Sequence, residues 1–216
     1  MLFFFKKHLK FLILLLHIQV FYARISFGEF ETFLTNIGFD GKNKTKGENL
    51  MKKQGYSTSV RALTRGAMIA ALYVALTYLA SALGLASGVI QFRISEALCI
   101  LPIFMPEAIV GLFIGCLLSN VFTGCLLWDV VFGSLATLIG AVGAYYLRKL
   151  PDKLICLATL PTIIANALIV PIVLIEVYGS TDSYFFILLT VTIGEIVCAG
   201  VMGTLLGYSI KKNNIF

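Results

Sequence analysis

The sequence lacks most of the residues and motifs that enzymes use for catalysis. It has two histidines, both within the first 17 of its 216 residues, and a single tryptophan. Its five cysteines are scattered through apolar stretches without a C-x-x-C pair, so neither a disulfide framework nor a zinc site is expected. It also lacks the G-x-x-x-x-G-K-[ST], H-E-x-x-H and G-x-S-x-G motifs. We therefore predict no metal, no cofactor and no catalytic residue.

Charged side chains are scarce in the body of the chain. Hydrophobic residues make up 59% of the sequence and the mean hydropathy is +0.93, which is too apolar for a soluble domain. Residues 66–210 carry four basic and seven acidic side chains, although the whole chain has a formal charge of +6. The excess of positive charge lies in the flanks, where it indicates membrane topology rather than nucleic-acid binding. The sequence predicts an integral protein of the lipid bilayer.

The first fifty residues fit neither a membrane span nor a simple signal peptide. A basic start and an apolar stretch precede Ala23, as in a signal peptide, but the run FLILLL is far shorter than the roughly 20 residues that span a bilayer. Lys46-Gly47-Glu48 back-translates to a purine-rich segment of the kind that precedes bacterial start codons, here that of Met51. We expect residues 1–50 to be translated leader or a poorly structured extension; a real signal peptide is the alternative.

Apolar segments separated by short polar turns predict an all-α bundle of six transmembrane helices. The second segment is short and contains Pro102, so it must lean on other parts of the protein. The predicted helices are 66–86, 96–105, 107–122, 128–147, 154–178 and 184–210.

Three basic clusters give the orientation of these helices. One precedes the first helix within residues 51–65, one lies at 148–153 and one begins the tail 211–216. The positive-inside rule places all three in the cytoplasm. The sequence therefore predicts a cytoplasmic amino-terminal segment 51–65, a membrane domain 66–210 and a cytoplasmic tail, with both termini on the same side.

The first helix carries small residues at a regular spacing. Ala67, Ala71 and Ala75 lie four residues apart and share one face. Small side chains at this spacing let a second helix approach closely, and close packing drives helix association in lipid. The spacing does not distinguish a helix of the same chain from a helix of another protein.

Polar residues inside the apolar helices are the candidate binding residues, because such groups are costly at membrane depth and are usually functional. Glu195 lies about halfway along its helix without a cation nearby in sequence. Its carboxyl group is therefore protonated, paired across the fold or reserved for a ligand. Asn120 and Asn166 are amides that serve helix packing or a ligand. Several such groups converging on the outer half of one bundle favour a pocket.

Other polar residues have ordinary structural alternatives. Arg93 and Glu96 are three residues apart and can form a salt bridge on one helical turn. Asp129 follows Trp128 near the start of a helix, which it can cap. Facing an outward pocket is the functional alternative for these residues. Glu107 suits the dipole at its helix start and is the weakest candidate for ligand contact.

Four segments carry a resemblance to a known family: LTRGAMIAALYVALT, QFRISEAL, GLFIGCLLSN and WDVVFGSLATL. From about Leu63 to Ile210 the sequence resembles the QueT family, which are six-helix substrate-binding (S) components of energy-coupling factor (ECF) transporters associated with queuosine precursors. The resemblance implies a multi-pass protein of the bacterial cell membrane that is not an enzyme. It does not cover residues 1–50.

The resemblance also implies partners and a cargo. In S components an A-x-x-x-A face on the first helix docks on the transmembrane coupling subunit, and Ala67, Ala71 and Ala75 match that pattern. Two cytoplasmic ATPases would complete the complex. The cargo would be queuine or a 7-deazaguanine such as preQ1 or preQ0.

Deazaguanines offer N–H donors and a carbonyl on one edge, and some carry an aminomethyl cation, so the site needs acids, a donor and a stacking face. The expected acids are Glu195, Glu96 and Asp129, the other polar contacts are Asn120, Asn166 and Arg93, and the stacking ring is Trp128 or Phe92. Three alternatives stay open. The cargo can be another vitamin-like solute, the protein can be a membrane enzyme with Asp129 and Glu195 as an acid/base pair, or the polar residues can be purely structural and tolerate neutral isosteres.

Overall fold

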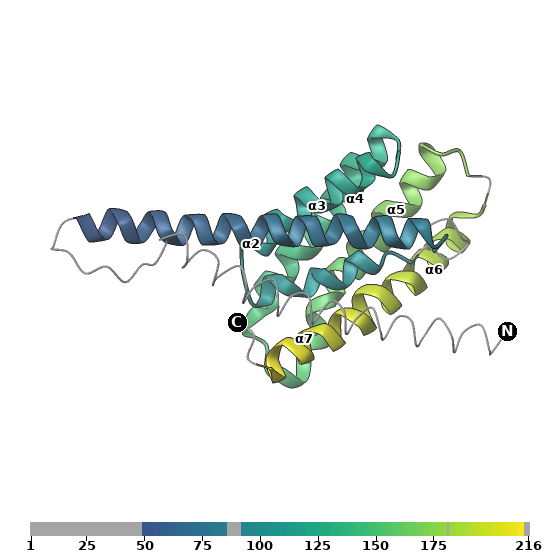
Figure 1. Ribbon diagram of the computed structural model, residues 1–216. Coiled ribbons are helices and arrows are strands. Elements are labelled where there is room, and N and C mark those ends of the chain that lie inside the picture. Colours follow the sequence, from purple (N-terminus) through teal and green to yellow (C-terminus); the bar gives the residue numbers. More distant parts are fainter. Residues whose placement is uncertain (1–48, 86–91, 181, 214–216) are drawn as a thin grey trace. The chain divides into compact units, whose positions relative to one another are not determined.

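The computed structural model describes residues 49–85, 92–180 and 182–213, which are helical almost throughout and contain no strand (Figure 1). The described residues fall into two units, one of residues 49–62 with 209–213 and one within residues 63–208. The second unit holds every candidate site residue. Most of the predicted leader lies outside the described residues.

The six predicted apolar segments are all helical. The elements are α2 (Asn49–Ala82), η1 (Ile94–Ile103), α3 (Ala108–Phe122), α4 (Leu127–Tyr146), η2 (Leu147–Lys149), η3 (Asp152–Thr159), α5 (Leu160–Glu176), α6 (Tyr184–Glu195), η4 (Ile196–Met202) and α7 (Gly203–Lys212). Four stretches of them are long and apolar enough to cross a membrane: Val60–Ala82, Leu127–Lys149, Leu154–Glu176 and Tyr184–Lys212. Among the described residues, η1 and α3 are shorter apolar helices.

Helix α2 begins earlier than the sequence predicted. We expected it to start at residue 66, but it runs from Asn49 for 34 residues without a break. The polar segment before residue 66 contains no proline and continues the helical hydrogen bonding. At 1.5 Å per residue the helix is roughly 50 Å long, against roughly 30 Å of bilayer hydrocarbon. Part of α2 therefore extends beyond the membrane.

Three segments depart from α-helical geometry. The short element η1 is a 3₁₀ helix, whose rise of roughly 2.0 Å per residue lets 10 residues reach roughly 20 Å. The predicted fifth helix begins as the 3₁₀ segment η3 before it becomes α5. The sixth contains the π-helical segment η4, which starts directly after Glu195. π-Bulges inside α-helices are frequent at functional sites.

Helices α2 and α3 pack through glycines that the sequence analysis did not single out. A Cβ atom at Gly111 would lie 2.5 Å from the carbonyl oxygen of Gly66, and one at Gly115 would lie 2.8 Å from the Cβ of Tyr73. Both contacts require a missing side chain, as in the small-residue interfaces of membrane helices. This packing fixes the buried face of α2 and directs Tyr73 into the bundle, where it is 1% exposed.

Replacing Gly111 by alanine is expected to destabilise the protein by about 1–3 kcal/mol, because the added methyl group must displace backbone. This outweighs the gain of about 0.5–1 kcal/mol that alanine usually brings to a helix. Thermal unfolding of the detergent-solubilised chain measures the effect. Gly200→Ala is the control, since its nearest contact would be an ordinary 3.5 Å. Equal unfolding temperatures for the two variants would contradict the close α2–α3 contact.

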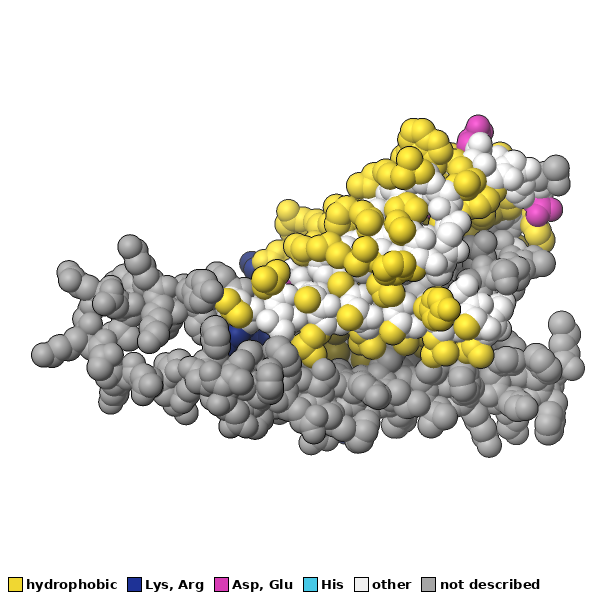
Figure 2. Space-filling model, turned by 45° about the horizontal axis from the view of Figure 1, so that its top comes forward, with side chains coloured by type: hydrophobic (Ala, Val, Ile, Leu, Met, Phe, Trp, Pro, Cys, Tyr) yellow, Lys and Arg dark blue, Asp and Glu magenta, His cyan; other side chains and the backbone are white. Residues whose placement is uncertain are grey.

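The face of the second unit that Figure 2 shows carries many apolar side chains. Large side chains such as Leu127 (74% exposed) and Phe185 (78% exposed) point outward, whereas the buried set includes Glu96, Asn166 and Glu195. A protein surrounded by lipid is expected to bury its polar groups and to expose its apolar groups. The chain is a multi-pass membrane protein.

Candidate functional site

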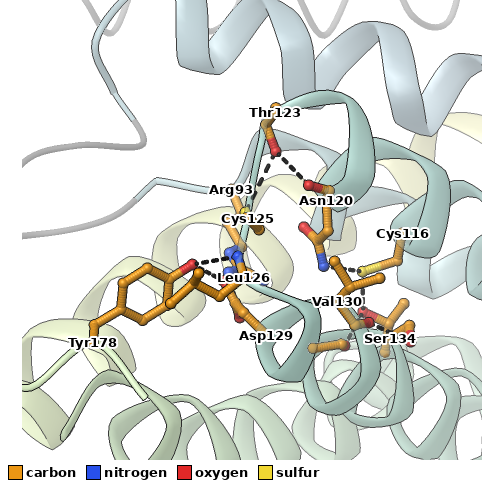
Figure 3. A network of polar contacts seen from close by, with 12 residues as sticks. Arg93, Cys116, Asn120, Thr123, Cys125, Leu126, Asp129, Val130, Ser134 and Tyr178 are labelled. Carbon is orange, nitrogen blue, oxygen red and sulfur yellow. Dashed lines mark hydrogen bonds and ion pairs between the residues drawn. The ribbon is translucent and has the colours of Figure 1, made fainter.

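One polar cluster joins η1, α4 and the end of α5 (Figure 3). An Nη2 atom of Arg93 lies 4.0 Å from Oδ1 of Asp129, and the Tyr178 hydroxyl donates to Oδ2 of Asp129 at 3.0 Å. Partial burial, and then the neighbouring Asp129 carboxylate, raise the pKa of Tyr178 to about 12, so its hydroxyl remains a donor at neutral pH. Asp129 is therefore held on both oxygens.

Gly133 is the point at which three predicted site residues meet. A Cβ atom there would lie 3.1 Å from Nδ2 of Asn120, 3.6 Å from Oδ1 of Asp129 and 3.7 Å from Nη1 of Arg93. Because Gly133 has no side chain, an amide, a carboxylate and a guanidinium can all approach its Cα atom closely. The sequence had assigned these three residues to one site, and the structure brings them together.

Glu96 is the centre of a second set of contacts, deeper in the bundle. It is fully buried, and its Oε1 accepts from the Tyr73 hydroxyl at 2.5 Å and from Thr137 Oγ1 at 3.2 Å. Its Oε2 accepts from Cys99 Sγ at 3.0 Å. Both oxygens of Glu96 thus have protein partners on η1, α2 and α4.

A third group, on α5 and α6, consists of polar atoms without partners. Thr162, Asn166 and Glu195 are 0%, 0% and 4% exposed. Within the described chain, Oγ1 of Thr162, both amide atoms of Asn166 and Oε2 of Glu195 make no hydrogen bond of good geometry, although the Asn166 amide lies close to the Glu195 carboxyl group. We call these four atoms the orphan group. Each buried group left unsatisfied costs about 1–3 kcal/mol, so such atoms need an explanation.

The orphan group is connected electrostatically to the other two clusters. Glu195 interacts with Glu96 and Arg93 and lies beside Asn166. Segment η1, which carries Glu96 and directly follows Arg93, packs against η4, the π-helical segment that follows Glu195. The polar residues therefore form one buried region, in which the orphan group is the part open to new hydrogen bonds.

Several structural alternatives from the sequence prove wrong. Arg93 does not pair with Glu96 but with Asp129, because η1 directs Glu96 towards Tyr73 and Thr137. Asp129 makes no capping hydrogen bond at the start of α4, whose N-cap is Leu126. Its carboxylate instead pairs with Arg93 and accepts a hydrogen bond from the Tyr178 hydroxyl.

The predicted stacking ring is on the outside. Trp128 is 59% exposed and stacks on the exposed Phe132, with ring centroids 6.0 Å apart. An indole at the end of a membrane helix is typical of the lipid–water interface. Phe92 is half-buried beside Arg93 and keeps its place as the candidate ring.

Sequence reasoning missed five residues at these polar clusters, four of them inside the bundle and one, Tyr178, 44% exposed at its edge: Tyr73, Gly133, Thr137, Thr162 and Tyr178. A signal existed for some of them. Tyr73 lies on the face of α2 opposite Ala67 and Ala71, and Thr162 precedes Asn166 by one helical turn. Tyr178 gave no signal, because its pairing with Asp129 joins residues that are 49 positions apart.

Comparison with known proteins finds a family match that begins where the second unit begins. Residues 63–212 match the family model described as QueT transporter. The chain belongs to the QueT transporter family. A curated relative, the "Queuosine precursor transporter QueT" of Lactococcus lactis subsp. cremoris (strain MG1363), is 40% identical over 73 residues. The match covers 34% of this chain and 43% of that protein, so it spans less than half the length of this relative. No solved structure matches the chain.

The family match confirms the resemblance seen in the sequence, and the family that it names is one of transporters. Tyr73, Glu96 and Thr137 form the fully bonded part of the buried region, and the orphan group forms the unbonded part.

Proposed function

We propose that the chain is the high-affinity substrate-capture subunit of an ATP-driven ECF-type importer that takes up a queuosine precursor. The observation that carries the proposal is the orphan group of Thr162, Asn166 and Glu195, buried in a member of the QueT transporter family. A cargo that completes these hydrogen bonds recovers the cost of leaving them unmade, and this adds to its affinity.

The chemistry of the orphan group suits one edge of a deazaguanine. A carboxylate oxygen on Glu195 accepts from ring and exocyclic N–H groups. The Asn166 amide offers a donor to the ring carbonyl and an acceptor as well, and the Thr162 hydroxyl can do either. Queuine and the 7-deazaguanines preQ1 and preQ0 share this edge. Another vitamin-like solute with the same donor and acceptor pattern is the alternative cargo.

The charges of the buried region favour a cationic cargo. It contains the guanidinium of Arg93 and the carboxyl groups of Glu96, Asp129 and Glu195. Asp129 takes the ion pair with Arg93, and no ion pair to Glu96 or Glu195 occurs among the described residues. An aminomethyl ammonium group would supply the missing positive charge, as in preQ1 or queuine, whereas the nitrile of preQ0 would not.

The membrane enzyme that the sequence left open has less support. It required Asp129 and Glu195 as an acid/base pair, but Asp129 is held by Arg93 and Tyr178. Glu195 lies instead beside Asn166 and near Glu96. The family is a transporter family as well.

We place six passes in the bacterial cell membrane with both termini in the cytoplasm. Basic side chains at the end of α4, Arg148 and Lys149, and at the end of α7, Lys211 and Lys212, support this orientation. The shorter elements η1 and α3 would complete the bundle as the second and third passes.

For α2 we propose docking on a transmembrane coupling subunit, with two cytoplasmic ATPases completing the importer. Ala67, Ala71 and Ala75 are all exposed, on the face opposite the buried Ala70 and Tyr73. Of the most apolar 18-residue stretch of α2, 22% is buried, compared with 44% of the corresponding stretch in each of the other three long spans. A helix that presents small residues outward and is buried so little has room for a second helix.

Reconstitution of the full chain into proteoliposomes tests this function. Alone, the chain is expected to bind preQ1 without accumulating it inside the vesicles. With a coupling subunit and two ATPases, accumulation should appear and depend on ATP. The same complex without this chain is the control. Accumulation by the chain alone, without ATP, would contradict the role of a capture subunit.

A further inference from the structure

An apolar groove runs along the surface between α4 and α5, away from the polar clusters. Its volume is about 670 Å³. Every residue that lines it is nonpolar: Ile139, Gly143, Leu147, Leu150, Leu157, Leu160, Pro161, Ile164, Ala165, Leu168 and Ile169. A groove without a polar group cannot orient a polar solute, so its natural occupant is a hydrocarbon chain.

The dimensions of the groove match one lipid leaflet. Its lining extends along one side from Leu157 to Ile169, which at 1.5 Å per residue is roughly 18 Å. Half of the bilayer hydrocarbon is roughly 15 Å thick. The helices approach closely within the groove, because a Cβ atom at Gly143 would overlap the ring of Pro161. An acyl chain of one leaflet would fit along this length.

One end of the groove carries two positive charges. Leu147 and Leu150 line the groove, and between them in the chain lie Arg148 and Lys149, both exposed. The Arg148 guanidinium lies over the ring of Tyr145, 4.1 Å from its centroid, which limits the positions it can take. The two cations therefore sit where the chain leaves the groove, at the level of lipid headgroups.

We propose that this groove binds one anionic phospholipid, with an acyl chain along α4 and α5 and the headgroup phosphate at Arg148 and Lys149. Basic residues beside a gap between membrane helices attract anionic headgroups. The charge distinguishes this occupant from a zwitterionic lipid, which gains little from two cations. It also distinguishes it from an apolar helix of a partner protein, which would leave both cations unpaired.

The test measures which lipids stay on the protein. The full chain is reconstituted in nanodiscs of equal parts phosphatidylglycerol and phosphatidylethanolamine, transferred to detergent and analysed by native mass spectrometry. We expect one retained phosphatidylglycerol per chain. The double variant Arg148→Ala/Lys149→Ala should retain roughly 10- to 30-fold less of it, since each cation near the surface contributes about a factor of five. Lys211→Ala/Lys212→Ala, which removes two basic residues that do not line the groove, should retain it fully.

A second pair of variants tests the acyl chain. Ile164 lines the groove and is 55% exposed, while Leu189 lies on α6 outside it and is 57% exposed. Ile164→Trp fills the groove and should abolish retention, whereas Leu189→Trp should not. Equal retention of the two lipids, no retained lipid on the wild-type chain, or full retention by Ile164→Trp would each overturn the proposal. An absence of retained lipid would favour a protein partner or an empty groove, whereas full retention by Ile164→Trp would mean that the lipid is held elsewhere on the chain.

Discussion

Replacing Glu195 by glutamine is expected to weaken binding of an aminomethyl deazaguanine by roughly 10- to 150-fold. Glutamine preserves the size of the side chain but removes its negative charge, and a hydrogen bond to a charged group contributes about 1.5–3 kcal/mol. Titration calorimetry of the detergent-solubilised full chain with preQ1 measures the change. Glu176→Gln is the control, because Glu176 is exposed at the end of α5.

A substitution at the neighbouring Asn166 distinguishes a role in binding from a role in helix packing. Both atoms of its amide lack a partner, so leucine of similar shape should stabilise the empty protein or leave its stability unchanged. The same substitution should weaken preQ1 binding at least tenfold. A structural amide would behave in the opposite way, since its loss would lower the unfolding temperature and spare the binding. Unchanged affinity in both Glu195→Gln and Asn166→Leu would show that the orphan group does not contact the cargo.

The second large effect is expected on α2, where Ala71→Trp should abolish transport without changing binding. Ala71 is exposed in the middle of the small-residue face. An indole ring at this position would keep a second helix from approaching closely. ATP-dependent uptake by the complete importer should fall at least tenfold. The affinity of the isolated chain for preQ1 should stay within a factor of about two, because binding residues lie on the other elements.

Leu189→Trp is the matched control for this experiment, since Leu189 is equally lipid-facing on α6 at 57% exposed. It should leave both uptake and affinity unchanged. Normal uptake by Ala71→Trp would contradict docking through this face. Loss of binding together with uptake would instead indicate that α2 packs its small residues against its own chain.

The helices could be predicted from the sequence because their signals are local. Apolar runs and prolines gave the segments later found as α3, α4 and α6, within about two residues at their starts. The geometry inside the segments was not accessible in this way. The 3₁₀ helix η1 and the π-helical η4 depend on how neighbouring elements pack, and no local pattern specifies either.

The sequence largely predicted which polar residues are buried, but it did not predict which of them contact one another. The cost of polar groups in lipid singled out Glu96, Asn166 and Glu195, and all three are buried. The partner of each depends on distances across the bundle. Sequence proximity suggested Arg93 with Glu96, whereas the fold pairs Arg93 with a residue of α4. Trp128 lies outside the buried region for a related reason, since an aromatic ring at a helix end suits the membrane interface as well as a ligand.

The most direct test is equilibrium binding to the purified full chain in the absence of any partner or ATP, comparing preQ1 with its nitrile relative preQ0. The orphan group and the uncompensated acids Glu96 and Glu195 predict tight binding of preQ1, at least tenfold weaker binding of preQ0, and no binding of thiamine. Equal affinity for preQ1 and preQ0 would contradict the charge-based part of the site. No binding of any deazaguanine to a folded sample would contradict the capture role itself.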